Sequence, residues 1–343
     1  MSKDYLLGID IGTSACKVAI FNKNGKVMAS ANGDYPVYYP HEGWAQQKPD
    51  EWWHAVCGAI CECLETGNIS GEQIAGVGID GQSWSAIAID HEGNVLTDTP
   101  IWMDTRAQEI CDRLNNEIGS ENIFNVAGNS LQPSYSTAKI LWYKENLPEV
   151  YAKIYKILQS NSYIAFKLTG AVTQDVSQGY GLHCFNMKKG CWDEKMCKRL
   201  GIPMEFLPEI CDCDHVVGTV TGKAAAECGL VEGIPVVAGG LDAACGTLGA
   251  GVIHSGETQE QGGQAGGMSI CTEEYKADPR LILSYHVVPG KWLLQGGTTG
   301  GGGVMRWFEH EFADYERMMK EQTGVSSLNQ LNKIAEKVGP GCD

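Results

Sequence analysis

The sequence predicts an α/β fold, and three observations support this prediction. Residues 6–17, LLGIDIGTSACK, read as an apolar strand that ends at Asp10, turns, and continues into a second strand. Residues 74–80, IAGVGID, form a continuous apolar run of strand length, and residues 50–65 place apolar side chains at helical spacing. Such a helix is expected to cover one face of a sheet.

Length, composition and charge narrow the class of protein. The 343 residues suggest about two domains, and 43% hydrophobic residues is ordinary for a globular chain. The formal charge of −16, from 26 basic and 42 acidic residues, argues against nucleic acid or an anionic membrane as a partner. No apolar run approaches transmembrane length, and the first ten residues do not read as a signal peptide. We therefore expect a cytoplasmic protein that binds small molecules.

The spacing of the 14 cysteines does not match that of a metal site. Cys57, Cys61 and Cys63 lie within the helical pattern, and Cys211 and Cys213 have no matching second pair. We expect reduced thiols in the core and at the surface.

The first turn, Gly12-Thr13-Ser14, has two interpretations. Gly12 allows the backbone to approach an anion, Thr13 and Ser14 offer N–H and hydroxyl donors, and Asp10 can hold a cation through water. Such a turn suits a magnesium nucleotide. The alternative is a hairpin between two core strands, with Asp10 capping the turn.

The next elements follow from local signals. Asn24-Gly25 marks a tight turn, and Pro49 suits the first turn of the helix at 50–65. A strand at 86–90 follows the one at 74–80, and the tripeptide GID occurs both at 8–10 and at 78–80. We interpret this recurrence as architectural similarity rather than as a repeat array.

The middle of the chain is predicted to be mainly helical. In PIWMDTRA (100–107), Asp104 or Thr105 can cap a helix that runs to about Ile118, with Arg106 in its first turn. A helical module is expected over 136–170, interrupted by a short strand at 154–158.

A buried strand at 235–238 precedes the segment GGLDAACGTLGAG, whose small residues allow a helix to pack closely against backbone. Asp242 would lie in the first turn of that helix. We place the domain boundary near Gly251, which gives domains at 1–250 and 251–343. The second has two glycine-rich stretches and a long amphipathic pattern, and we expect it to be incomplete at this length.

Four stretches, taken in order, resemble the FGGY carbohydrate kinases. They are GIDIGTSACK, GIDGQSW with PIWMDTRA, AGGLDAACGTLGAG, and the late glycine loops at 260–270 and 295–308. The segment PHEGWAQQKPDEWW is similar to the corresponding stretch of xylulokinases. The resemblance covers essentially the whole chain, as that family's first domain and the start of its second.

This resemblance implies an actin-like, ribonuclease H-like fold with two domains around a cleft, and transfer of the ATP γ-phosphate to a hydroxyl of a sugar or polyol. It makes Asp242 the catalytic base and Asp10 the Mg²⁺-linked aspartate, and a homodimer is compatible with it. A carboxylate near a helix N-terminus is expected to stay ionised, as a base must. The implied ATP-binding residues are Gly12, Thr13, Ser14, Lys17, Gly263, Gln264, Gly266, Thr298 and Gly300.

The implied acceptor site comprises Gln82, Ser83, Trp84, Asp104, Arg106 and Asp242. Where xylulokinases usually carry Met-His, this chain has Ser83-Trp84, so we expect a sugar or polyol other than D-xylulose, with Trp84 against its carbon face. The alternative places Trp84 in the core. Asp104 and Arg106 can bind hydroxyls or form a structural cap and ion pair.

Two further departures bear on activity. Ala243 follows Asp242, where the family usually has Asn or Gln, and Gln264-Ala265 replaces the hydroxyl residues of the second phosphate turn. The alternative to a sugar kinase is therefore a non-catalytic sugar-binding or regulatory relative. An actin-like or chaperone-type ATPase shares the first turn, but it does not explain the acceptor-site motifs.

Overall fold

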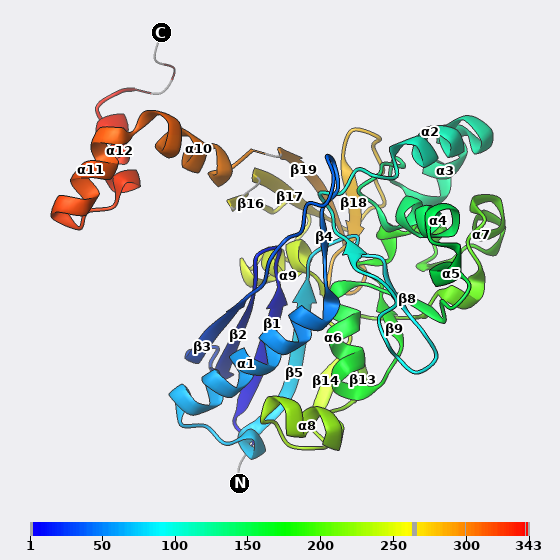
Figure 1. Cartoon of the computed structure of the whole chain (residues 1–343), viewed down its shortest axis with the longest axis horizontal. Coiled ribbons are helices and arrows are strands. Elements are labelled where there is room, and N and C mark those ends of the chain that lie inside the picture. Colours follow the sequence, from blue (N-terminus) through cyan, green and yellow to red (C-terminus); the bar gives the residue numbers. More distant parts are fainter. Residues whose placement is uncertain (1–2, 263–265, 299, 340, 342–343) are drawn as a thin grey trace. The chain divides into compact units, whose positions relative to one another are not determined.

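The computed structural model describes residues 3–262, 266–298, 300–339 and 341. The chain divides into two compact units, 1–257 with 271–294 and 258–270 with 295–343 (Figure 1). The family-domain boundary near Gly251 stays a prediction.

The first unit is built on a central sheet. Its strand order is β13-β14-β5-β1-β2-β3, and β15 also pairs with β5. The strands β1, β2 and β3 form an antiparallel meander, whereas β5 is parallel to β1, and β14 and β15 are parallel to β5. The predicted strand–turn–strand start is confirmed. The strands are β1 (Tyr5–Ile11), β2 (Ala15–Asn22), β3 (Val27–Asp34), β5 (Ile74–Gly81), β13 (Val216–Thr219), β14 (Pro235–Val237) and β15 (Gly240–Leu241).

The two GID tripeptides lie side by side in this sheet. The parallel register of β1 and β5 pairs residues 8–10 with residues 78–80. Since both strands run in the same direction, their carboxyl ends, each carrying an aspartate, meet at one edge of the sheet.

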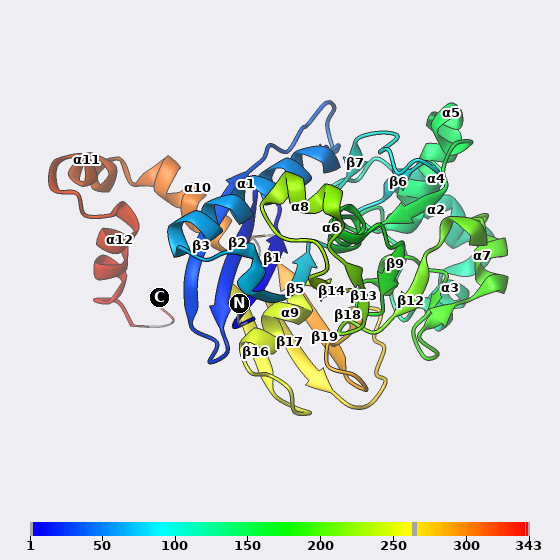
Figure 2. The same cartoon turned by 90° about the horizontal axis from the view of Figure 1, so that it is seen from below.

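Helices cover both faces of this sheet. Helix α1 (Pro49–Gly67) has Pro49 in its first turn and buries Trp52, Val56 and Ile60 completely in the main core. Helices α6 (Ser160–Thr169) and α8 (Gly222–Cys228) pack with α1. Figure 2 shows α9 (Asp242–Gly249) on the opposite face of the sheet. The predicted helix at 50–65 and the helix beginning at Asp242 are therefore confirmed.

A mainly helical part with its own apolar core completes the first unit. Its helices are α2 (Gln108–Leu114), a π-helical turn (Asn115–Gly119), α3 (Ser120–Ala127), α4 (Ser136–Asn146), α5 (Pro148–Tyr151) and α7 (Glu194–Leu200). Short strands pair as β4 (Gln46–Gln47) with β7 (Thr99–Pro100), β6 (Ile87–Ile89) with β8 (Lys156–Leu158), β9 (Thr173–Asp175) with β12 (Glu209–Cys211), and β10 (Phe185–Asn186) with β11 (Cys191–Trp192). The remaining elements are the 3₁₀ turns Gly71–Gln73, Gly179–Gly181 and Met204–Phe206, and strand β18 (Ile282–Tyr285).

The helix expected to begin at Asp104 or Thr105 begins at Gln108 instead, so that prediction is wrong. The Asp104 carboxylate accepts hydrogen bonds from the backbone N–H groups of Arg106 and Ala45. These bonds hold residues 104–106 in a turn, and Arg106 lies before the helix. The module predicted at 136–170, with its short interrupting strand, is confirmed.

The second unit contains a β-hairpin and three helices. Strands β16 (Thr258–Gly262) and β17 (Gly266–Thr272) are antiparallel, and β19 (Trp292–Thr298) lies beside β17, since a Cβ built on Gly267 would be 3.3 Å from the Gly296 carbonyl oxygen. The helices are α10 (Gly302–Phe312), α11 (Asp314–Thr323) and α12 (Ser327–Ala335). Among the residues described in either unit, none of the helices combines the length and apolarity needed to span a bilayer.

Candidate active site

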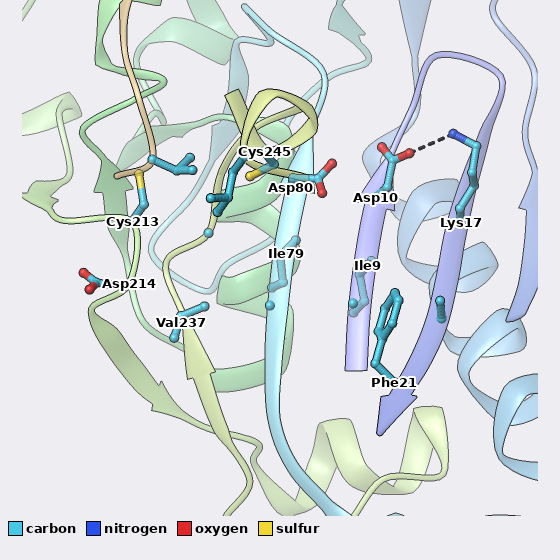
Figure 3. A pocket seen from close by; sticks show the side chains of 16 residues that line it. Ile9, Asp10, Lys17, Phe21, Ile79, Asp80, Cys213, Asp214, Val237 and Cys245 are labelled. Atoms are coloured by element: carbon cyan, nitrogen blue, oxygen red, sulfur yellow. Dashed lines mark hydrogen bonds and ion pairs between the residues drawn. The ribbon is translucent and has the colours of Figure 1, made fainter. Parts of the chain in front are cut away.

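Three aspartates from distant parts of the chain meet at the carboxyl edge of the central sheet. Asp10 is next to last in β1, and its register partner Asp80 is next to last in β5. Strand β15 pairs Gly240 with Asp80, and Asp242 begins α9 directly after this strand. Figure 3 shows Asp10 and Asp80 on their adjacent strands at the edge of a cavity.

Gly239 makes this convergence possible. Its φ is +73°, and a Cβ there would lie 1.7 Å from the Ile79 carbonyl oxygen, so only glycine fits. The Gly239 N–H donates to the Cys213 carbonyl (2.9 Å), and the Leu241 N–H donates to Ser177 Oγ (2.9 Å). The backbone of residues 239–241, which precedes Asp242, is therefore held against β5.

Asp242 titrates near neutrality. Burial raises the pKa of its carboxyl to about 7, against the lowering effect of the Ala243 N–H, which donates to Asp242 Oδ1 at 2.6 Å. The nearby Asp10 carboxylate also raises this pKa. The expectation that the helix N-terminus keeps Asp242 firmly ionised is wrong, because the desolvation effect is larger. A carboxyl with this pKa can both accept and release a proton at physiological pH.

Asp80 has the most strongly perturbed environment of the three aspartates. Burial raises the pKa of Asp80 well above the usual carboxyl range, and the charges of Asp10 and Asp242 raise it further. The closeness of the other two carboxyl groups thus favours the protonated form of Asp80.

Side chains from three other segments hold the first turn. The Tyr35 hydroxyl donates to the Gly12 carbonyl (2.7 Å), and Gln47 Nε2 donates to the Thr13 carbonyl (2.8 Å). The indole N–H of Trp102 donates to Thr13 Oγ1 at 3.0 Å. These bonds give the turn a fixed shape.

Lys17 and Ser14 are the exposed members of the turn region. Lys17 Nζ lies 2.8 Å from Asp10 Oδ2, and this hydrogen bond raises the pKa of Lys17 (Figure 3). The Lys17 ammonium group is therefore charged at neutral pH and sits beside the turn, where an anionic phosphate would need a cation.

A cavity of about 550 Å³ opens beside these groups on the sheet face that α9 flanks. Asp10, Lys17 and Asp80 give it polar groups near the carboxyl ends of the strands (Figure 3). The remainder of the lining is mainly apolar and comes from the sheet, α9 and neighbouring loops: Gly8, Ile9, Ala19, Phe21, Gly78, Ile79, Cys213, Asp214, Val237, Gly239, Cys245, Leu248 and Val287.

Gln82 is buried at the end of β5. Its Nε2 donates to Gln47 Oε1 (2.8 Å), while its Oε1 has no hydrogen-bond partner within the described ranges. Since Gln47 also donates to the Thr13 carbonyl, a buried chain of amides links Gln82 to the first turn. The carbonyl oxygen of Gln82 therefore has an unused acceptor position.

Trp84 is half-buried and stacks on another aromatic residue. Its ring centroid lies 4.1 Å from that of Tyr135 with 26° between the planes, and 5.8 Å from that of Tyr180. Tyr180 and Ser83 share a hydrogen bond between their hydroxyls (3.3 Å). Burial raises the pKa of Tyr180, and the Asp242 charge adds a smaller increase.

Asp104 and Arg106 form a buried ion pair, as in the structural alternative foreseen from the sequence. Their side chains are 0% and 3% exposed, and Arg106 NH2 lies 2.8 Å from Asp104 Oδ2. Arg106 NH2 also donates to Gln46 Oε1 (2.8 Å), and the guanidinium lies over the Trp44 ring at 3.9 Å from its centroid. These groups bind each other, which leaves little of either side chain for a ligand.

The second unit holds the remaining ATP-binding candidates. Gly266 in β17 lies near the end of β19, since a Cβ there would be 3.3 Å from Thr298 Oγ1. Thr298 Oγ1 donates to the Gly300 carbonyl at 3.0 Å. Gly263 and Gln264 lie outside the described residues.

Sequence reasoning missed Asp80, Tyr135 and Tyr180 as site residues. The recurrence of GID at 78–80 was the available signal for Asp80, because matching strand ends in a parallel sheet place matching side chains together. Tyr135 directly precedes α4 and Tyr180 lies in the 3₁₀ turn Gly179–Gly181, and tertiary packing brings both to Trp84.

The residues present fit a water-mediated Mg²⁺. Asp10, Asp80 and Asp242 bring carboxyl oxygen atoms to one edge of the sheet, and Mg²⁺ prefers such hard oxygen ligands. Among the described residues, no group of three His, Cys, Asp or Glu side chains is arranged to hold a metal directly. Mg²⁺ usually keeps several waters and is held by one or two carboxylates and by phosphates, so such a group is not required.

The chain is similar in sequence to carbohydrate kinases. Residues 5–249 match the N-terminal domain of the FGGY family of carbohydrate kinases. A xylulose kinase from Bacillus subtilis (strain 168) is 29% identical over 326 residues, which are 94% of this chain and 65% of the relative. A gluconokinase from Bacillus licheniformis is 28% identical over 340 residues, or 99% of this chain and 66% of the relative.

Solved structures of sugar kinases have a similar fold to this chain. The xylulose kinase from Rhodospirillum rubrum superposes with a TM-score of 0.87 at 27% identity, covering 98% of this chain and 68% of that one. The ligand-bound xylulose kinase from Lactobacillus acidophilus gives 0.84 at 26% identity, covering 90% and 63%. The chain thus spans about two thirds of the length of these relatives. The predicted actin-like, ribonuclease H-like fold is confirmed by this likeness.

Proposed function

The chain belongs to the FGGY family of carbohydrate kinases, and on that premise we propose that the protein transfers the γ-phosphate of ATP to a hydroxyl of a sugar or polyol. The observation that best supports this proposal is the meeting of Asp10, Asp80 and Asp242 at one sheet edge, beside a turn with an exposed lysine. Phosphoryl transfer depends mainly on positioning and charge neutralisation, which such an edge supplies.

In the proposed mechanism, Asp242 is the general base. One oxygen of the Asp242 carboxylate accepts the proton of the acceptor hydroxyl while the hydroxyl oxygen attacks the γ-phosphorus. The bond between the γ-phosphorus and the bridging oxygen breaks, and ADP leaves with its electrons. The Thr13 and Ser14 N–H groups and the Lys17 ammonium group bind phosphate oxygens, while the Gly12 N–H donates to the Ala15 carbonyl (3.1 Å) and closes the turn. Asp10 would hold Mg²⁺ through water, and the bound ion supplies further neutralisation of phosphate charge. Gly266, Thr298 and Gly300, with Gly263 and Gln264, are proposed to contact the nucleotide.

The proposed acceptor belongs to the xylulose-like class of sugars and polyols, which here includes aldonates because both xylulose kinases and gluconokinases are relatives. Gln82 Oε1 accepts a ligand hydroxyl, and the Ser83-Trp84 wall favours an acceptor other than D-xylulose. Asp104 and Arg106 are proposed to act structurally, because their buried ion pair holds the segment of Gln46 and Trp44. The proposal places the protein in the cytoplasm, where ATP is available, and allows a homodimer.

The test is a coupled assay of ADP formation over pentuloses, hexuloses, aldonates and alditols, with Asp242→Asn as the comparison. We expect one acceptor class to stimulate ADP release, with D-xylulose not the best acceptor. Asp242→Asn should lower kcat by about 100-fold or more while sugar binding by calorimetry is retained. If the wild-type protein binds a polyol but releases no ADP with any of them, the non-catalytic sugar-binding function replaces this proposal.

A further inference from the structure

Lys139 is a completely buried cation held by backbone carbonyl groups. It lies in α4 and is 0% exposed. Its Nζ donates to the carbonyl oxygens of Trp84 (2.8 Å), Ile101 (2.8 Å) and Ser134 (2.5 Å). Three acceptors match the three N–H donors of a protonated lysine.

Each of these carbonyls belongs to an aromatic residue or directly precedes one. The first belongs to Trp84 itself, the second directly precedes Trp102, and the third directly precedes Tyr135. The rings of Trp84 and Tyr135 stack on each other, and the Trp102 indole bonds to Thr13 of the first turn. One ammonium group therefore ties together the proposed acceptor wall and the segment that contacts the proposed phosphate turn.

The backbone at Trp84 requires such restraint. Its φ is +60°, a left-handed conformation that is rare for a bulky residue and persists only where its surroundings enforce it. Neighbouring carbonyls in the loop are also held by buried side chains. The donors are Gln178 to Gly81 (3.0 Å), Ser160 to Gln82 (2.7 Å), Ser136 to Ser85 (2.8 Å) and Tyr143 to Ala86 (3.0 Å). Lys139 is the charged donor of this set.

Stability alone is a poor explanation for a lysine at this position. Burial lowers the pKa of Lys139 to about 7, although the Asp104 charge raises it, which shows that the protein environment disfavours the charge. An apolar side chain of the same shape often gives equal or greater stability than a buried charge. The three directed hydrogen bonds instead supply geometric specificity.

We propose that Lys139 is a positioning residue that determines acceptor specificity by fixing Trp84, Trp102 and Tyr135 through their backbone. This inference rests on the proposed sugar-kinase function. Without the ammonium group, Trp84 relaxes from its left-handed conformation and the acceptor wall loses its fixed shape.

The test compares Lys139→Met, which removes all three donors at similar volume, with Tyr143→Phe. The control removes one buried hydrogen bond to the Ala86 carbonyl in the same loop. For Lys139→Met we expect kcat/KM for the best acceptor to fall by about 10- to 100-fold, and the ratios between acceptors to approach one. Tyr143→Phe should preserve the acceptor ranking. A Lys139→Met variant that folds and keeps the wild-type ranking overturns the inference.

A second readout needs no turnover. In protein labelled with 5-fluorotryptophan, Lys139→Met should shift or broaden the ¹⁹F resonances of Trp84 and Trp102 and leave that of Trp53 unchanged. Unchanged Trp84 and Trp102 resonances overturn the inference even if the wild type proves inactive, which separates its failure from that of the proposed function. Lys139→Gln, which keeps amide donors, should give intermediate effects. If both variants are unfolded, Lys139 is a stability element and the inference is wrong.

Discussion

Asp10 and Asp80 are register partners on adjacent parallel strands, and each follows the same Gly-Ile pair. This relationship places a second carboxyl group directly beside the one proposed to hold Mg²⁺. Burial and the neighbouring carboxylates raise the pKa of Asp80 well above its usual range, which favours its protonated form.

Replacing Asp80 by asparagine should therefore have little effect. Asparagine has the shape of the neutral acid and can donate a hydrogen bond to Asp10, as the protonated acid does. We expect the free energy of unfolding at pH 7 to change by no more than about 0.5 kcal/mol, and kcat by less than about threefold. Denaturant titrations and the ADP-release assay measure both. Asp10→Asn is the contrasting variant and should abolish turnover; a comparable loss in Asp80→Asn would show that Asp80 acts as an ionised group.

The rate should rise with pH through neutrality. Burial raises the pKa of Asp242 to about 7, and only its ionised form can accept the hydroxyl proton. Below that pH, kcat should fall about tenfold per pH unit.

The free energy of unfolding should change with pH in the opposite direction to the rate. The pKa of Asp242 in the folded state lies above the unfolded value near 3.9, so the folded state loses stability as the pH rises from about 4 to 7. Asp242→Asn removes this titration and should be more stable than the wild type at pH 8, by up to about 4 kcal/mol.

A kinetic pH profile and urea melts at pH 5 and pH 8 check both expectations. If kcat does not change when the assay pH is varied from about 5.5 to about 8, Asp242 is not the base. A wild-type protein that gains stability relative to Asp242→Asn on going to pH 8 would contradict the buried environment.

Gly239→Ala should be one of the most damaging small substitutions in the chain. The added methyl group would lie 1.7 Å from the Ile79 carbonyl, so the strand that delivers Asp242 must move. We expect a loss of at least about 3 kcal/mol of unfolding free energy, or loss of folding. Gly251→Ala is the matched control, because its φ is +79° and nothing lies within 4 Å of the added Cβ. It should lose only about 1 kcal/mol from the strained φ. Equal effects at the two positions in thermal unfolding would refute the steric explanation.

Arg106→Gln should destabilise the protein strongly, because it leaves the Asp104 carboxylate buried without its cation. Breaking a buried pair in this way typically costs about 3–5 kcal/mol. Arg113→Gln breaks the Arg113–Glu145 pair, whose side chains are 44% and 41% exposed, and should change stability by less than about 0.5 kcal/mol. Urea unfolding of the two variants measures the difference. If Arg106→Gln is as stable as Arg113→Gln but fails to bind sugar, Arg106 is a ligand-binding residue.

Much of the architecture could be predicted from the sequence because its signals are local. The strand–turn–strand start, helix α1 and the helix at Asp242 follow from periodicity, glycine and proline positions within a few residues. The order of motifs then pointed to the family. The start of α2 could not be predicted, because Asp104 bonds to Ala45, a residue 59 positions away in the chain.

The site was predictable in its motifs but not in its chemistry. Asp10, Lys17 and Asp242 belong to recognisable stretches, and the structure places them around one cluster. The pKa of Asp242 depends on burial, which no local pattern encodes. The contacts of Trp84 with Tyr135 and Tyr180, and of Lys139 with three separated carbonyls, arise only when distant segments pack together.

The left-handed backbone of Trp84 implies that thermal stability and acceptor discrimination make opposite demands on this loop. Holding a tryptophan at φ +60° costs about 1–2 kcal/mol relative to glycine, and the loop around it is fixed by buried polar groups that an apolar core would not need. Substitutions that raise the melting temperature should therefore accumulate readily at Trp84 and Lys139, and each would loosen the acceptor wall. Selection for thermal stability alone would be expected to erode substrate discrimination before it altered the sheet.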